Sequence, residues 1–262
     1  MPPNFEKYAI YWVPRFGSKL ATFGASWTGW CADAGEYRPR PLISEISEDL
    51  RPYLGKVRLH GFHGKLHKAF PLTPGRSDWA LESIVEAIAD TTSLTVVPRL
   101  HLVLVNECLA LAPADGDREL DRLALHLTRN LAPINADAIH PGEAEPVMAS
   151  ALPGFADSPA VLTTPVGAIP ILGEGCFHIP LTDPLPRPLA GRFAAELAPL
   201  VLPLLDTPQI IDEVSIVGDP GQNRPFRLLR RIGLNQDPFE SHAAALLTLG
   251  PNVYAPLKAR SH

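Results

Sequence analysis

The sequence has few of the residues that stabilise small or extracellular folds by cross-linking. It contains 3 cysteines and 2 methionines among 262 residues, and 7% of its residues are aromatic. The cysteines, Cys31, Cys108 and Cys176, are an odd number at wide spacings, which fits neither a disulfide framework nor a zinc-binding pattern. We therefore expect the reducing environment of the cytoplasm.

An excess of positive charge and a long apolar run are also missing. The formal net charge is -5, which gives no broad electrostatic reason to bind an extended nucleic acid or an anionic membrane. No apolar run reaches the roughly 20 residues that span a bilayer, and residues 1–7 do not resemble an export signal. We expect no membrane partner, and a local site must hold any anionic ligand. The oligomeric state is left open.

Hydrophobic residues make up 46% of the chain, which is enough to bury a core. Residues 8–13 (YAIYWV) and part of 57–70 are expected to form strands. A helix is predicted over 77–89, where Ser77 can cap the first turn. Residues 94–111 are typical of a hairpin that turns near Asn106 and Glu107.

The second half of the chain repeats this mixture less regularly. Asp117 can cap a helix with an apolar stripe, and six prolines between 141 and 170 predict an irregular crossing between two lobes. A strand, a helix and two more strands are expected at 176–182, 189–205, 211–217 and 226–232. Pro199 and Pro203 should shorten or kink that helix. A last helix is expected over 238–249.

Two of the expected strands share a pattern of side chains. The first reads HGFHGKLH (60–67) and the second CFHIPLT (176–182), each with an aromatic residue, a histidine and a leucine three positions later. Because side chains alternate along a strand, His63, Lys65 and His67 should share one face, and so should His178, Pro180 and Thr182. Two such strands side by side would direct His63 and His178 into one cleft.

These motifs resemble those of the 2H phosphoesterase superfamily, which carries two His-x-Thr-x motifs. The sequence is similar to one bacterial family of it, often encoded with phosphonate-degradation genes, over nearly its whole length. The segments that carry the resemblance, in the family's order, are KYAIYWVP (7–14), FGASWTGW (23–30), GFH (61–63), ECLALAP (107–113), FHIPLT (177–182), IDEVSIVGDPG (211–221) and PFRLLRRIGL (225–234).

The resemblance implies an α+β, bilobal fold of two ferredoxin-like halves around a central cleft. It implies a single domain over 1–234, with lobes at about 1–140 and 171–234 and the crossing at 141–170. Residues 235–262 form a C-terminal extension outside the resemblance.

The resemblance also implies metal-independent catalysis on a small cyclic phosphate or phosphodiester, without a cofactor. His63 and His178 would be the acid-base pair, because an imidazole with a pKa near 6.5 can accept or donate a proton near neutral pH. Lys65 would hold the phosphate as a point charge. The other candidate substrate-binding residues are His60, His67 and Thr182.

Two positions depart from the family's motifs. Lys65 and Pro180 stand where the family has threonine, and proline has neither a hydroxyl nor a backbone N–H. Pro180 should therefore leave its strand short, bulged or at an edge. Because half of the expected oxyanion cradle is missing, an alternative stays open: a catalytically silent or repurposed protein that binds a small ligand or a partner protein in the same cleft.

A metal site is the less favoured interpretation of the same histidines. His60, His63, His67 and His178 could form a cluster, but His60 has the wrong strand parity and no acidic residue joins them. We therefore expect no metal ligands among them.

Overall fold

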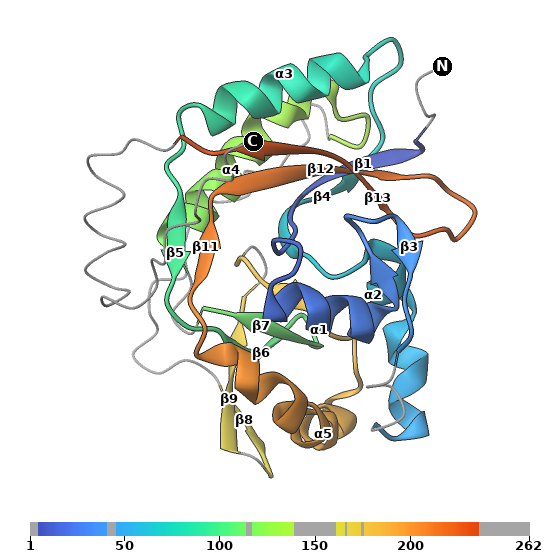
Figure 1. Ribbon diagram of the computed structural model, residues 1–262, viewed down its shortest axis with the longest axis vertical. Helices are drawn as coiled ribbons and strands as arrows, with labels where there is room; N and C mark the ends of the chain where they lie inside the picture. Colours follow the sequence, from blue (N-terminus) through green and yellow to red (C-terminus); the bar gives the residue numbers. More distant parts are fainter. Residues whose placement is uncertain are drawn as a thin grey trace, which may run out of the picture.

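The computed structural model describes residues 5–40, 46–113, 117–138, 161–165, 167–173 and 176–235. Two main sheets lie in its upper and lower halves, each with helices packed on it (Figure 1). The expected α+β class is confirmed. The helix predicted over 238–249 and the expected irregular stretch 141–160 lie outside the described residues.

The upper sheet has the strand order β13-β12-β1-β4 and is antiparallel throughout. Its strands are β1 (Lys7–Trp12), β4 (Gly64–Phe70), β12 (Glu213–Asp219) and β13 (Arg227–Gly233). Along β1, Tyr8, Ile10 and Trp12 face the main hydrophobic core, while Ala9 and Tyr11 face a second, smaller cluster. This alternation decides which side chains of β4 lie on the same face as Tyr11 and which lie in the main core, because paired residues of neighbouring strands share a face.

The lower sheet has the order β10-β7-β6-β9-β8. Its strands are β6 (His101–Val105), β7 (Cys108–Ala112), β8 (Val161–Thr164), β9 (Gly167–Leu172) and β10 (Ile179–Pro180). The hairpin predicted around Asn106 and Glu107 is confirmed as β6-β7, and both turn residues have positive φ, 48° and 64°. Positive φ at both central positions matches the right-handed twist of the flanking strands.

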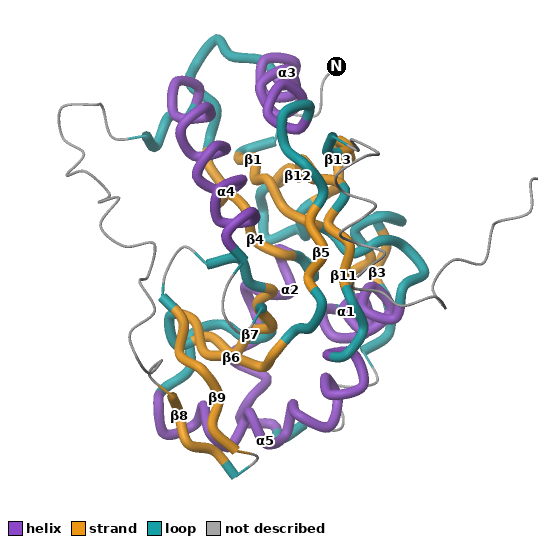
Figure 2. Tube along the Cα trace, turned by 90° about the vertical axis from the view of Figure 1, so that its left-hand side faces the viewer, coloured by secondary structure: helices purple, strands orange, loops and turns teal. Residues whose placement is uncertain are grey.

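Two short pairs of strands complete the described sheets. β5 (Thr95–Val97) pairs with β11 (Gln209–Ile211) along the chain segments that join the two halves, as Figure 2 shows. β2 (Trp30–Cys31) pairs with β3 (Glu36–Tyr37) beside the upper sheet.

Helices α3 (Asp78–Ala89) and α4 (Arg118–Leu131) cover the upper sheet, with α3 against β12 and β13 and α4 against β4. Both predicted N-caps are confirmed. The hydroxyl of Ser77 accepts from the N–H of Ala80, and the carboxylate of Asp117 accepts from two N–H groups of the first turn. The short η3 (Ala132–Ile134) follows α4 directly.

Three further helical segments were not predicted from the sequence. They are α1 (Lys19–Thr28), η2 (Glu48–Leu54) and α2 (Gly55–His60). Helix α1 has clear local signals, since Ser18 caps its first turn and Gly29 ends it with φ +76°.

Helix α5 (Arg187–Leu205) packs on the lower sheet against β6, β7 and β8. The expected shortening at Pro199 and Pro203 is wrong, because the helix continues through both. Packing of its apolar side chains outweighs the lost backbone hydrogen bonds; the buried ones include Phe193, Leu197, Val201 and Leu204. By length and composition α5 is also apolar enough to cross a membrane, with 44% of its apolar window buried here.

The expected division into a lobe of 1–140 and a lobe of 171–234 does not match the sheets. β1 from the start of the chain pairs with β12 from its end, and β6 pairs in parallel with β9. Each sheet thus combines strands from both halves of the sequence. Residues 161–170, expected to be irregular, lie in the β8-β9 hairpin. Long-range pairing of strands leaves no local trace in the sequence, which is why the exchange of strands was not predicted. The β8-β9 hairpin is local, but Pro165 and Pro170 favoured an irregular segment.

Candidate active site

The two histidine motifs are joined at their backbones. The N–H of Lys65 donates to the carbonyl oxygen of His178 over 2.9 Å. His63 immediately precedes β4 and His178 immediately precedes β10, so each histidine stands at the start of a strand. The hydrogen bond therefore brings the two motifs together at the junction of the upper and lower sheets.

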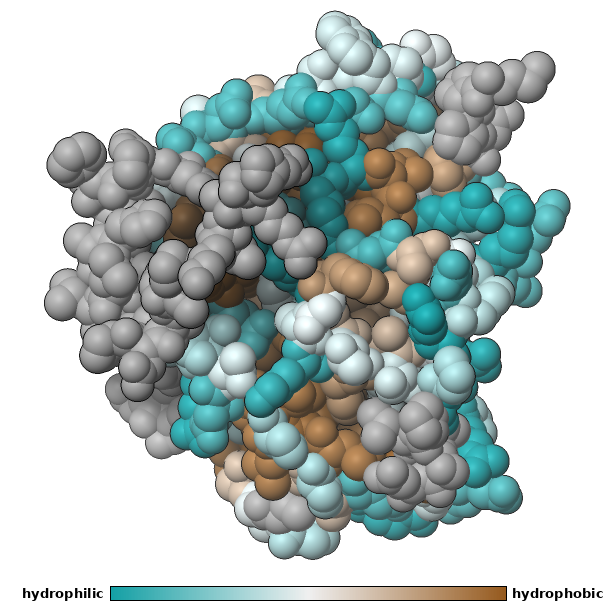
Figure 3. All heavy atoms as spheres, viewed as in Figure 1, coloured by the Kyte–Doolittle hydropathy of each residue, from teal (hydrophilic) through white to brown (hydrophobic). Residues whose placement is uncertain are grey.

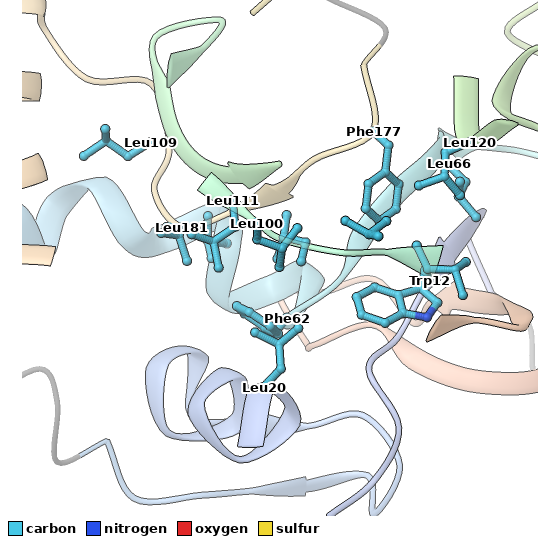
Figure 4. Close-up of a cluster of buried hydrophobic side chains, with 14 of the residues drawn as sticks. Trp12, Leu20, Phe62, Leu66, Leu100, Leu109, Leu111, Leu120, Phe177 and Leu181 are labelled. Atoms are coloured by element: carbon cyan, nitrogen blue, oxygen red, sulfur yellow. The ribbon is translucent and has the colours of Figure 1, made fainter. Parts of the chain in front are cut away.

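The phenylalanines of the two motifs fix this junction. Phe62 packs edge-to-face on Phe23 with ring centroids 5.7 Å apart, and Phe177 packs on Trp12 at 6.1 Å. Figure 4 shows both rings in one cluster with leucines of both sheets. A Cβ at Gly64 would lie 2.3 Å from the ring of Phe177, so the absence of a side chain there permits the close approach.

The two imidazoles are held in the same way. Nδ1 of His63 lies 2.8 Å from the carbonyl oxygen of Gly61, and Nδ1 of His178 lies 2.8 Å from that of Cys176. A carbonyl oxygen only accepts, so each Nδ1 carries the proton and each neutral ring presents Nε2 as a base. No described hydrogen bond reaches either Nε2. Neither atom is among the fully buried unpaired atoms of the described residues.

Burial and charge both favour the neutral form of His63. The side chain is 5% exposed, and burial is the main cause that lowers the pKa of His63 to about 3, with the charges of His60, His178 and Lys65 adding to it. The pKa of His178, which is 8% exposed, is also lowered by burial and by Lys65. Lys65 thus acts on both rings.

His60, a predicted substrate-binding residue, and Tyr11, which was not predicted, are both neighbours of His63. The ring of Tyr11 stacks on His63 with centroids 3.8 Å apart, and its hydroxyl is hydrogen bonded to Nδ1 of His60 over 2.8 Å. Burial raises the pKa of Tyr11, so the hydroxyl stays protonated. His60 ends α2 and stacks on Phe226. The alternation of side chains along YAIYWV (8–13) puts Tyr11 on the face opposite to the core-facing Tyr8 and Ile10. This alternation could have predicted Tyr11 as a residue of the site.

His67 lies on the other face of β4, and the expected shared face with His63 and Lys65 is wrong. Lys65 pairs with Tyr11, but His67 pairs with Ile10, because the register of β4 shifts between these pairs. Two residues of β4 therefore oppose one step of β1, as in a β-bulge. His67 packs on Phe70 and donates from Nδ1 to the carbonyl oxygen of Lys68.

Thr182 is 1% exposed, and its hydroxyl oxygen accepts a hydrogen bond from the N–H of Leu109 over 3.0 Å. The carbonyl oxygen of Leu109 in turn accepts from the N–H groups of both Leu181 and Thr182. Thr182 thus connects the end of the second motif to β7.

The predicted disturbance at Pro180 is confirmed. β10 is two residues long and forms the edge of its sheet, with Pro180 opposite Ala110. The two N–H groups after Pro180 converge on one carbonyl oxygen, which ends the regular pairing.

Among the described residues, no group of three or more His, Cys, Asp or Glu side chains is arranged to hold a metal ion.

Comparison with known proteins gives one family match and several similar solved structures, two of which follow. One structure is described as a phosphoesterase, with 10% identity, a TM-score of 0.43, and coverage of 89% of this chain and 100% of that one. The other is E. coli LigT complexed with 3'-AMP, with 12% identity, a TM-score of 0.42 and the same coverage. No curated protein sequence matches the chain.

The family model of DUF1045, described as a protein of unknown function, matches residues 66–227. The matched range includes His178 and begins just after His63 and Lys65. Because it spans more than half of the sequence, the chain belongs to the DUF1045 family.

Proposed function

We propose that the protein hydrolyses or opens a small cyclic phosphate or phosphodiester by acid-base catalysis with His63 and His178. The observation that carries the proposal is the matched anchoring of the two rings, each with Nδ1–H bound to the carbonyl two residues earlier and with no described hydrogen bond at Nε2. The backbone hydrogen bond from Lys65 to His178, which joins the two motifs, supports a shared site. Such a pair suits a reaction that removes one proton and delivers another.

His63 is assigned as the base because its deeper burial favours the neutral ring. It takes a proton from water, the water oxygen forms a bond to phosphorus, and the bond from phosphorus to the leaving oxygen breaks. His178 then protonates the leaving oxygen, and the product is a phosphomonoester when the substrate is a cyclic diester. A phosphate anion bound between the rings raises the pKa of His178, because the anion favours the protonated ring. The protonated His178 then supplies the proton for the leaving oxygen.

Lys65 is assigned to hold the phosphate, since its charge already acts on both histidines. His60 acts through Tyr11, which stacks on His63. Thr182 is not assigned to the ligand, because it is 1% exposed and its hydroxyl lies against the N–H of Leu109. His67 is excluded from it by its position on the other face of β4.

A second candidate function is ligand or partner binding without turnover. It is favoured by Pro180, which stands at an expected oxyanion position without a donor, and by the low exposure of both rings. Three free cysteines, with Cys31 and Cys176 buried, suit the cytoplasmic setting proposed for either function.

The test is a screen of the purified protein against 2',3'-cyclic nucleotides and cyclic ribose phosphates, followed by phosphorus NMR. We expect conversion of at least one cyclic ester to a phosphomonoester at a rate that a chelator leaves unchanged. Saturable binding of the same esters without conversion would favour the second candidate instead.

A further inference from the structure

Among the described residues, no acidic side chain pairs with the guanidinium of Arg40. Its Nε donates to the carbonyl oxygen of Trp27 over 3.0 Å, but its Nη2 is buried and has no hydrogen-bond partner. The side chain crosses Gly29, where a Cβ would lie 2.5 Å from Cδ of Arg40. Gly29 also has φ +76°, so the crossing depends on glycine for two reasons. An unpaired buried donor of this kind costs free energy that an anion nearby would offset.

Other positive charges lie close to Arg40 and add to this cost. Burial is the main cause that lowers the pKa of Arg40 to about 10, and the charges of Arg58 and Arg51 lower it further. Arg51 has one weak partner, Glu48, at 3.5 Å on the surface. Arg58 has no partner among the described residues. The cluster therefore holds more positive charge than its neighbours among the described residues neutralise.

A cavity of about 360 Å³ opens beside this cluster. Lys56 and Arg58 line it together with the aromatic residues Trp30 and Tyr37. The two rings pack edge-to-face with centroids 5.2 Å apart, and Tyr37 is 70% exposed. Hydrophilic side chains gather along the right-hand side of the face in Figure 3, where Figure 1 shows β3 and η2.

The one acidic side chain that lines this cavity has other bonds. The carboxylate of Asp183 accepts from the backbone N–H groups of Lys56 and Val57 over 2.9 and 3.0 Å. Its charge is thus directed to the start of α2, and the side chains of Lys56 and Arg58 stay available to an external anion.

We propose that this cavity binds the phosphate group of a small aromatic phosphate ester, with Arg58 and Lys56 at the phosphate, Arg40 behind them, and Tyr37 against the aromatic ring. Guanidinium groups bind phosphate through paired, charge-assisted hydrogen bonds. The volume and the mixture of aromatic and charged lining suit a ligand of this size. The site is separate from the histidine pair and does not depend on its proposed reaction.

The test is calorimetric titration of the full chain with phenyl phosphate and with inorganic phosphate, at constant ionic strength. A His63→Asn, His178→Asn background removes the other candidate phosphate site. We expect phenyl phosphate to bind this double variant at one site, and more tightly than inorganic phosphate does. Arg58→Gln should weaken it about tenfold or more, the loss expected for one charged hydrogen bond. The matched control is Arg129→Gln, an exposed arginine on α4, which should leave binding unchanged.

Arg40→Met gives a second readout in the same background. Removing a partly buried cation with an unpaired Nη2 should raise the melting temperature of the ligand-free protein, while the further rise on adding phenyl phosphate should shrink. The inference is overturned if phenyl phosphate does not bind the double-histidine variant. It is also overturned if Arg58→Gln binds as tightly as its parent, or if Arg40→Met keeps the full ligand-induced rise.

Discussion

The N–H of Lys65 and the carbonyl oxygen of His178 form a 2.9 Å hydrogen bond that joins β4 of the upper sheet to the start of β10 in the lower one. Through this bond, the backbones of two motifs far apart in the sequence meet at the junction of the two sheets.

Gly64→Ala should loosen the junction. A Cβ there would lie 2.3 Å from the ring of Phe177 and 3.2 Å from Trp12, and neither ring has space to retreat in the core. We expect a loss of about 1–3 kcal/mol in the free energy of unfolding, the usual cost of overpacking. Urea titration measures it. Gly173→Ala is the control, because a Cβ at Gly173 meets nothing within 4 Å; equal stability of the two variants would contradict the role of Gly64.

Thr182→Val should destabilise the protein, because it leaves the N–H of Leu109 without its acceptor in a buried position. The expected loss is about 1–3 kcal/mol, the cost of one buried unsatisfied group. Thr182→Ser keeps the hydroxyl oxygen and should lose much less. If Thr182 instead binds substrate, Thr182→Val would raise KM with little change in urea stability.

Acid should destabilise the fold partly through His63. Its folded pKa is about 3, below the value near 6.5 of an unfolded histidine, so the unfolded chain binds more protons between these pH values. The contribution of His63 to stability is complete above about pH 6.5 and is lost as the pH falls toward 3, at up to about 1.4 kcal/mol per pH unit. His63→Gln should reduce that slope in urea titrations between pH 4 and 7. The exposed His126→Gln on α4 should not, and equal slopes for both variants would refute a buried neutral His63.

Pro180→Thr tests the missing oxyanion donor. The strand at this position is already at an edge and two residues long, so threonine can replace proline without breaking a regular ladder. If phosphate binding limits the reaction, the restored hydroxyl should raise kcat/KM by up to about 10²-fold, the worth of one such donor. Steady-state rates on a cyclic nucleotide measure it, and a fall in rate would assign Pro180 a different function.

Local patterns predicted much of the fold and part of the site. Ser77 and Asp117 marked the starts of α3 and α4, and Asn106 with Glu107 marked the β6-β7 turn, because caps and tight turns are chosen by a few adjacent residues. The face of His67 was missed because the register shift in β4 depends on how the strand pairs with β1. The exchange of strands between the two halves depends on pairing over almost the whole chain.

Turnover of a cyclic phosphate by single and double histidine variants tests whether His63 and His178 act as one acid-base pair. We expect His63→Asn and His178→Asn each to lower kcat by about 10²-fold or more. The double variant should be only slightly slower than the worse single one, since the residues act as a unit. His126→Asn should match the native rate. Native-like turnover by either single histidine variant would contradict the account.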